Sequence, residues 1–344
     1  MNLSEFVTSL SAVLIDSERF RTSRAYHSTV RSVLSFSLTA DIPLKNVFTK
    51  SFLADYQAFL RNKGLQLNTI SFYMRMLRSL YHQALERDMV RYVPALFNHT
   101  YTGYETTVKR AVDPKVILDI DTLDISTAPE LEPVRDFFML SFYLQGMSFI
   151  DLAYLRRNQY NGSSITYHRQ KTGSRVTVPV VHQARELINK YIDQSPTEEY
   201  LLPIIQDSGI AARTYYETAL RRQNRNLKRL MELGNIKEKI TTYVARHSWA
   251  TTAYHTGVNV SLISQGMGHR TETITRIYLA AFSLGVMAEA NQLVVAAVQA
   301  ANIANKTNTA SITGRNTTNK RGENSTTIYN ALKGLPQSPM KKYF

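Results

Sequence analysis

Hydrophobic residues in the first hundred positions recur with a helical period and predict several α-helices. The stretch "TKSFLADYQAFLRNKG" has a suitable N-cap in Thr49 and a suitable end in Gly64. Its apolar face is formed by Phe52, Leu53, Tyr56, Phe59 and Leu60. The stretch "NTISFYMRMLRSLYHQALERD" predicts a second helix whose apolar face is formed by Ile70, Met74, Leu77, Tyr81 and Leu85.

Two further helices are predicted after residue 130. "LEPVRDFFMLSFYLQ" is an apolar helix that ends before Gly146. "SFIDLAYL" begins the next helix, and Ser148 and Asp151 have the spacing of a capping pair at its start.

A β-hairpin is predicted in "SSITYHRQKTGSRVTVPVV". Val176, Val178 and Val180 alternate with other residues, which is the period of a strand, and residues 172–174 read Thr-Gly-Ser, a turn sequence. Helical patterns return from Gln183 to about Ala301. The chain is therefore predicted to be mainly α with a small β-hairpin, in the α+β class.

The pattern also divides the chain of 344 residues, which is long enough for two domains. Residues 1–102 form a predicted helical domain, 103–113 a polar linker, and 114–300 a second domain. Residues 301–344 are rich in Asn and Thr and poor in apolar residues, as in "NKTNTASITGRNTTNKRGENSTT". This composition predicts a polar, basic and disordered tail.

The composition of the chain indicates what kind of partner it binds. Hydrophobic residues make up 44% of the chain, enough for a sizeable core, while 41 Lys and Arg against 27 acidic residues give a net charge of +14. Such an excess favours a polyanionic partner, with nucleic acid as the first candidate and a membrane surface as the second.

Other compositional features exclude classes of protein. The absence of cysteine excludes disulfides, a thiol nucleophile and cysteine-based zinc sites. The N-terminus "MNLSEFVTSLSAVLI" has no early Lys or Arg, so we do not expect a signal peptide. No apolar run is long enough to span a bilayer. A cytoplasmic protein is expected.

Part of the positive charge lies on the predicted N-terminal helices. "DSERFRTSRAYHSTVRSVLSF" carries four arginines within a few turns, and the polar side of the later helix carries two more. These arginines could simply be solvated, or they could bind phosphates: Arg19, Arg21, Arg24, Arg31, Arg75 and Arg78. Their clustering on three helices favours a phosphate-binding surface.

The residues suited to chemistry are basic and aromatic. The sequence has no HExxH, no GxxxxGK[ST] and no GxGxxG after a strand, and it lacks a compact carboxylate group for two Mg²⁺ ions. "TTYVARHSWATTAYHTG" places Arg246 and His247 within one turn of Tyr243, and "MGHRTETITRIY" places Tyr278 nine positions after His269. No metal and no cofactor are therefore expected.

This set suits attack on a phosphodiester. A tyrosine oxygen can attack phosphorus and expel a sugar hydroxyl, which leaves a covalent phosphotyrosine. Without a metal, fixed Arg, His and Lys donors have to stabilise the charge on the phosphoryl oxygens. The lysine at the predicted hairpin tip, Lys171 in "HRQKTGS", can protonate the leaving 5′ oxygen.

In these motifs the chain resembles the tyrosine recombinases, also called phage-type integrases. "ARHSWAT" and "MGHRTETITRIY" look like two boxes of that family in the right order and spacing, and "QGMSFIDLAYL" adds to the resemblance. The resemblance covers residues 1 to about 300 and is closest to integrases of Bacteroides-type mobile elements. It implies a helical, SAM-like core-binding domain followed by a catalytic domain.

The resemblance also implies roles for individual residues. Tyr278 would be the nucleophile, Arg246 the second arginine of the family, His269 the phosphate-binding histidine and Lys171 the general acid. His247 is open to two interpretations, a packed structural residue or a phosphate contact.

The chain departs from the family pattern at two places. Where the family usually has His or Lys, three residues before the second arginine, this chain has Tyr243. The first catalytic arginine is missing, since Ser148 aligns with it and Gln145 occupies the other position where relatives place an arginine. Gln145 and Ser148 can donate hydrogen bonds, or Ser148 can serve only as a helix cap. Arg156, Arg157 and Arg175 are the candidates to replace the missing charge.

The resulting hypothesis is a site-specific DNA recombinase that works without metal or ATP, for integration, inversion or resolution of DNA. By resemblance, its partners would be double-stranded DNA and three further copies of itself on synapsed sites, with an accessory DNA-bending protein as a candidate partner in the bacterial nucleoid. The alternative hypotheses are a recombinase-derived DNA-binding protein with little or no catalysis, and a type IB topoisomerase.

Overall fold

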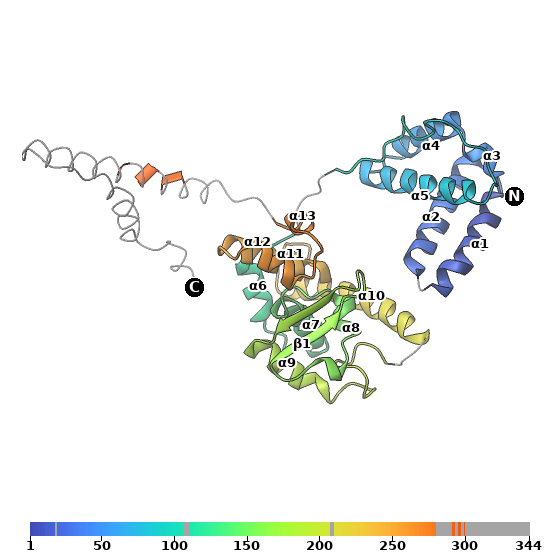
Figure 1. Cartoon of the computed structure of the whole chain (residues 1–344). Helices are drawn as coiled ribbons and strands as arrows, with labels where there is room; N and C mark the ends of the chain where they lie inside the picture. Colours follow the sequence, from blue (N-terminus) through green and yellow to red (C-terminus); the bar gives the residue numbers. More distant parts are fainter. Residues whose placement is uncertain are drawn as a thin grey trace, which may run out of the picture. The chain divides into compact units, whose positions relative to one another are not determined.

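The computed structural model describes residues 1–17, 19–105, 110–206 and 210–279, with scattered positions between 291 and 299 (Figure 1). The chain divides into two compact units, Met1–Val108 and Lys109–Phe344. The predicted tail, 301–344, lies outside the described residues.

The first unit consists of helices that pack around one apolar core. Its helices are α1 (Leu3–Asp16), α2 (Phe20–Ser37), α3 (Leu44–Val47), α4 (Lys50–Asn62) and α5 (Leu67–Leu85). Two hydrogen bonds at 2.7 Å join the helices within this core, from Tyr56 Oη on α4 to Ser32 Oγ on α2, and between Tyr26 Oη and Ser79 Oγ on α2 and α5.

The two helices predicted from periodicity in this unit are confirmed. Helix α4 begins after Thr49, whose side chain accepts a hydrogen bond from the backbone N–H of Phe52 at 3.2 Å, and it ends just before Gly64 at φ +71°. The predicted apolar faces lie on the core, since Leu53, Leu60 and the corresponding residues of α5 are buried.

The second unit combines helices with one short hairpin. Its elements are α6 (Pro114–Asp121), η1 (Pro129–Leu131), α7 (Glu132–Tyr143), α8 (Phe149–Ala153), η2 (Arg157–Gln159), β1 (Ser164–His168), β2 (Arg175–Pro179), α9 (His182–Ile192), α10 (Ile210–Leu233), α11 (Thr242–His255), α12 (Val260–Gly266) and α13 (Glu272–Arg276). The mainly α class with a small antiparallel sheet is thus confirmed.

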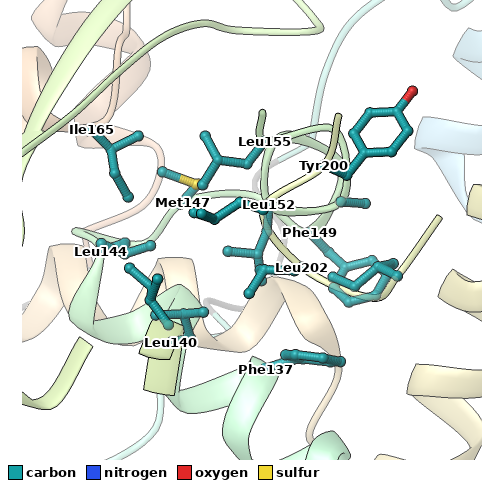
Figure 2. Close-up of a cluster of buried hydrophobic side chains, with 14 of the residues drawn as sticks. Phe137, Leu140, Leu144, Met147, Phe149, Leu152, Leu155, Ile165, Tyr200 and Leu202 are labelled. Atoms are coloured by element: carbon teal, nitrogen blue, oxygen red, sulfur yellow. The ribbon is translucent and has the colours of Figure 1, made fainter. Parts of the chain in front are cut away.

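The hairpin forms where the valine alternation predicted it. β1 and β2 pair antiparallel with Tyr167 opposite Val176, and the turn closes with a bond from the Gly173 N–H to the Arg169 carbonyl at 2.8 Å. Val176 and Val178 face the core while Arg175 and Thr177 are exposed on the other face. Figure 2 shows the core beside the hairpin, where Ile165 lies near Met147 and Leu144 of the loop after α7, in the same apolar cluster as Leu152 of α8.

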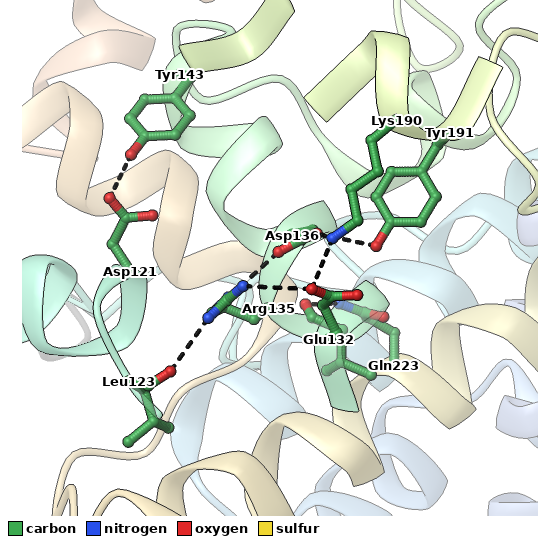
Figure 3. Close-up of polar contacts among 10 residues, drawn as sticks. Asp121, Leu123, Glu132, Arg135, Asp136, Tyr143, Lys190, Tyr191 and Gln223 are labelled. Carbon is green, nitrogen blue, oxygen red and sulfur yellow. Dashed lines mark hydrogen bonds and ion pairs between the residues drawn. The ribbon is translucent and has the colours of Figure 1, made fainter. Parts of the chain in front are cut away.

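A buried carboxylate joins α7 to α9. Asp136 accepts hydrogen bonds from Lys190 Nζ at 2.7 Å and Tyr191 Oη at 2.9 Å, and its other oxygen lies 3.2 Å from Arg135 Nε (Figure 3). Because a buried charge requires paired donors, this group fixes the two helices against each other.

The two ends of the predicted linker, 103–113, are each hydrogen-bonded to one unit. The Gly103 carbonyl accepts from Ser71 Oγ at 2.6 Å in the first unit. The Val112 N–H donates to Ser248 Oγ at 3.1 Å in the second, and the Asp113 side chain caps α6. Among the helices that are described, none is long and apolar enough to cross a membrane.

Candidate active site

Arg246 lies at the centre of the candidate site although it is a charged residue. It is on α11, only 1% of it is exposed, and its guanidinium donates to the carbonyls of Gly146 and Met267, each at 2.6 Å. These two carbonyls belong to segments outside α11, 100 and 21 positions from Arg246 in the sequence. Arg246 therefore fixes both segments against its own helix.

The loop that ends α7 approaches α11 closely because it contains a glycine. Gly146 has φ +69°, and a Cβ atom there would lie 2.9 Å from the Cα atom of Arg246. Glycine permits both the left-handed backbone and the contact. The glycine of the "QGM" motif is therefore needed for the close packing of this loop on α11.

His269 lies directly beside Arg246. Arg246 Nη2 donates to His269 Nε2 at 3.1 Å, so Nδ1 carries the ring proton and faces Thr275 Oγ1 at 2.9 Å. Burial, followed by the positive charges of Arg246, Arg169 and Lys171, lowers the pKa of His269 to about 3. His269 is therefore neutral at physiological pH.

Tyr278 reaches the same place because α13 separates it from His269. The short helix ends at Arg276, and the Tyr278 N–H donates to the Thr275 carbonyl at 2.8 Å. The Tyr278 ring centroid lies 4.9 Å from that of His269, and the Arg246 Cζ atom lies 5.6 Å from it. The nine-position spacing thus brings a phenol, an imidazole and a guanidinium together.

Tyr243 and His247 complete the aromatic side of the site from α11. The Tyr243 hydroxyl is hydrogen-bonded to the Tyr278 hydroxyl, and the His247 ring lies 4.6 Å from the Tyr278 ring between centroids. Burial, followed by this hydrogen bond, raises the pKa of Tyr243 above its usual range. His247 thus packs against the two phenols.

Three other predicted residues border this group. Lys171 is exposed at the hairpin tip, and its charge contributes to the lowered pKa of His269. Gln145 has φ +58°, and its Oε1 atom lies 2.5 Å from the place where a Cβ atom on Gly266 would stand. Ser148 is the N-cap residue of α8, and its hydroxyl donates to Asp151 Oδ2 at 2.5 Å.

Arg169 is a residue of the site that the sequence patterns did not indicate. It directly follows β1, only 7% of its side chain is exposed, and its Nε atom lies 3.5 Å from Asp151 Oδ2. Its Nη1 atom donates to the Gly268 carbonyl at 3.2 Å, next to His269. The only sequence signal for it was its place in "HRQKTGS", two residues before Lys171.

The arginines predicted to replace the missing charge have other contacts. Arg156 is 54% exposed and pairs with Glu199 at 2.9 Å, and Arg157 donates to the carbonyls of Ile192 and Tyr200. Arg175 is on the exposed face of β2, opposite the face of Val176 that meets Gly268. The prediction that one of these three arginines takes the vacant role is not supported by these contacts.

The assembled group has the donors for a phosphate and a phenol beside them. Arg246 provides a guanidinium beside the Tyr278 ring, and the charges of Arg169 and Lys171 act on the neighbouring His269. Within the described ranges, no group of three or more His, Asp or Glu side chains could hold a metal ion.

Comparison with known proteins gives the same family for both units. The phage integrase family pattern matches residues 124–283, and the phage integrase SAM-like domain pattern matches residues 2–100. The chain is 22% identical over 266 residues to tyrosine recombinase XerD of Listeria monocytogenes serovar 1/2a, covering 75% of this chain and 86% of that protein. It is 26% identical over 271 residues to a tyrosine recombinase of Pseudothermotoga lettingae, covering 74% and 85%.

Solved structures share the fold at low sequence identity. A lambda integrase dimer bound to a core site has a TM-score of 0.61 at 12% identity, covering 83% of this chain and all of that chain (100%). A lambda integrase tetramer bound to a Holliday junction has a TM-score of 0.60 at 14% identity, covering 81% and 78%.

Proposed function

Because the chain belongs to the phage integrase family as a tyrosine-type site-specific DNA recombinase, we propose that it cleaves and rejoins DNA through a covalent bond to Tyr278. The observation that carries this proposal is the meeting of Tyr278, Arg246 and His269 in one partly buried group. DNA binding alone does not require the Tyr278 hydroxyl to lie beside Arg246 and His269.

The reaction starts with attack of the Tyr278 oxygen on phosphorus. The P–O bond to the sugar 5′ oxygen breaks as the P–O bond to tyrosine forms, which leaves a 3′-phosphotyrosine and a free 5′ hydroxyl. The phenol loses one proton and the leaving oxygen gains one. Lys171 is the donor for the leaving oxygen, because it is a cation at the hairpin tip whose charge reaches His269.

Fixed donors stabilise the transition state in this account. Negative charge grows on the phosphoryl oxygens, and the Arg246 guanidinium is already oriented by two backbone carbonyls. A preoriented donor does not have to reorganise during the reaction, and loss of one such donor typically lowers the rate by about 10²–10³. Rejoining reverses these steps with another 5′ hydroxyl as the nucleophile.

Double-stranded DNA is the substrate, and we infer that the chain acts on it as a multimer, as lambda integrase does in its tetramer on a Holliday junction. Integration, inversion and resolution all use the same cleavage step. The predicted division into a core-binding domain (1–102) and a catalytic domain (114–300), the accessory protein and the Bacteroides-type relationship stay predictions.

A nicked DNA substrate that traps the covalent complex tests the proposal. The wild-type chain should give a covalent band on a denaturing gel, with or without EDTA. Tyr278→Phe should bind the same DNA in a gel shift and give no such band. Tyr215→Phe, which changes a tyrosine of α10 that is 38% exposed, is the matched control and should keep the band. A wild-type protein that binds DNA but forms no covalent band would favour the non-catalytic alternative.

A further inference from the structure

We propose that the Arg169 guanidinium contacts the scissile phosphate together with Arg246 and so provides the positive charge that Ser148 and Gln145 cannot. This inference rests on the proposed function, since it names a second cation for the same cleavage step. Its support comes from the position, the anchoring and the electrostatics of Arg169.

The position of Arg169 follows from the turn that precedes His269. Arg246 donates to the carbonyl of Met267, and Arg169 donates to the carbonyl of Gly268. Two guanidinium groups from different elements therefore hold successive carbonyls, and His269 is the next residue. The side chains of Arg169 and Arg246 therefore bind the same short segment, residues 267–268, next to His269.

Glycine at position 268 is what lets Arg169 come so close. Gly268 has φ +63°, and a Cβ atom there would lie 2.6 Å from Arg169 Cδ and 2.4 Å from Val176 Cγ2. Any other side chain would push the hairpin and Arg169 away from the turn.

Asp151 orients Arg169 without using its whole guanidinium. The carboxylate lies on the Nε side at 3.5 Å, and it also accepts from Ser148 Oγ at 2.5 Å and from the Gln170 N–H at 2.8 Å. Its negative charge is thus shared among three donors. Ser148, at the position of the missing family arginine, thereby contacts the same carboxylate that positions Arg169.

The site as it stands has an excess of buried positive charge. Burial, followed by the charge of Arg169, lowers the pKa of Arg246, and both charges lower the pKa of His269. The Arg246 Nε atom is buried and has no hydrogen-bond partner in the described part of the chain, while Arg169 Nε faces the Asp151 carboxylate at 3.5 Å without a hydrogen bond. Cations that repel each other and retain unused donors are arranged for an anion, and a phosphate would relieve both costs.

Cleavage of two matched DNA substrates tests the proposal. One nicked substrate carries the normal scissile phosphate, and the other carries a methylphosphonate there, which has no negative charge. Arg169→Ala should cleave the phosphate about 10²–10³-fold more slowly than the wild-type chain. Its loss on the methylphosphonate should be less than about 10-fold, because the charge that Arg169 stabilises is absent.

Matched variants separate this role from a structural one. Arg157→Ala removes an arginine that also donates to backbone carbonyls, those of Tyr200 and Ile192, and any loss should be equal on the two substrates. Arg169→Lys keeps the positive charge and should recover part of the cleavage rate on the phosphate substrate. This second variant keeps the proposal testable if Arg169→Ala folds poorly. Melting curves of each variant are recorded beside the rates.

Two results would overturn the inference. The first is that Arg169→Ala cleaves the phosphate substrate at the wild-type rate. The second is that both Arg169 variants lose cleavage rate by the same factor on the phosphate and the methylphosphonate substrates. Tyr278→Phe is run in parallel and should be inactive on both. If Tyr278→Phe cleaves, the proposed function fails; if it is inactive while Arg169→Ala is fully active, only the assignment of Arg169 fails.

Discussion

The hydroxyl groups of Tyr243 and Tyr278 are hydrogen-bonded to each other across 35 positions of sequence. Tyr243 stands where the family usually has a cation, so this chain has a neutral phenol in contact with its proposed nucleophile. Since burial and the bond itself raise the pKa of Tyr243, its hydroxyl stays protonated and can donate to the Tyr278 oxygen.

Tyr243→Phe is therefore expected to slow covalent-complex formation about 2- to 10-fold, the factor that the loss of one neutral hydrogen bond of 0.5–1.5 kcal/mol produces. DNA affinity in a gel shift should not change. The rate is measured in a single turnover on nicked DNA, with Tyr215→Phe as the control. A wild-type rate for Tyr243→Phe would show that the contact does not position the nucleophile.

His269 should make stability depend on pH. Its pKa is about 3 in the folded chain, against an ordinary value of 6.5, so the unfolded chain binds more protons between these values. Stability is then fully present above about pH 6.5 and is lost as the pH falls toward 3.

The measurement is the melting temperature at pH 7 and at pH 4.5. The two pKa values set an upper bound of about 2.7 kcal/mol on this loss at pH 4.5, and solvent screening of the partly exposed ring reduces it to about 1 kcal/mol. His269→Asn should therefore lose about 2–4 °C less than the wild-type chain between the two pH values. His182→Asn changes a histidine whose side chain is 76% exposed and should behave as wild type. Equal losses in all three proteins would contradict the assigned environment of His269.

Gly146→Ala should destabilise the second unit and reduce cleavage. The added methyl group would lie 2.9 Å from a backbone atom of Arg246, at a residue with φ +69°. We expect a loss of about 1–3 kcal/mol in the free energy of unfolding. Gly162→Ala is the control, since Gly162 also has positive φ, +88°, but its methyl group would meet nothing within 4 Å. If chemical denaturation gives equal losses for both variants, the close approach to Arg246 is unimportant.

Gln145→Arg should not raise the cleavage rate if Arg169 already provides the second positive charge. The position is also confined, because Gln145 Oε1 lies against Gly266 and the backbone has φ +58°. We expect an unchanged or lower single-turnover rate in the wild-type background. A rate increase of 10-fold or more would mean that the site lacks a cation despite Arg169.

The elements with a strong local pattern could be predicted from the sequence. Helix α4 begins after Thr49 and ends before Gly64 because capping and backbone preferences act within a few residues. The hairpin was readable from the alternation of Val176 and Val178. The shared site of His269 and Tyr278 was implied by the family resemblance, and the structure brings the two rings together across the short helix α13.

The contacts that were missed join residues far apart in the chain. Arg169 reaches the site through Asp151 and through the Gly268 carbonyl, 99 positions away, and no periodicity encodes such a contact. For the same reason Arg156, Arg157 and Arg175 were equally plausible replacements on the basis of sequence. Only the packing of the hairpin against the turn before His269 distinguishes Arg169 from them.

The most direct test of the central claim is to identify the tyrosine that becomes joined to DNA. The trapped complex is digested with nuclease and trypsin, and the nucleotide-bearing peptide is found by mass spectrometry. Tyr278 is the single tyrosine of the peptide 277–306, and Tyr243 is the single tyrosine of the peptide 240–246, so the two hydrogen-bonded phenols are distinguishable. We predict a nucleotide on Tyr278 alone; a nucleotide on Tyr243, or on neither peptide of a trapped complex, would contradict the role of Tyr278 as the nucleophile.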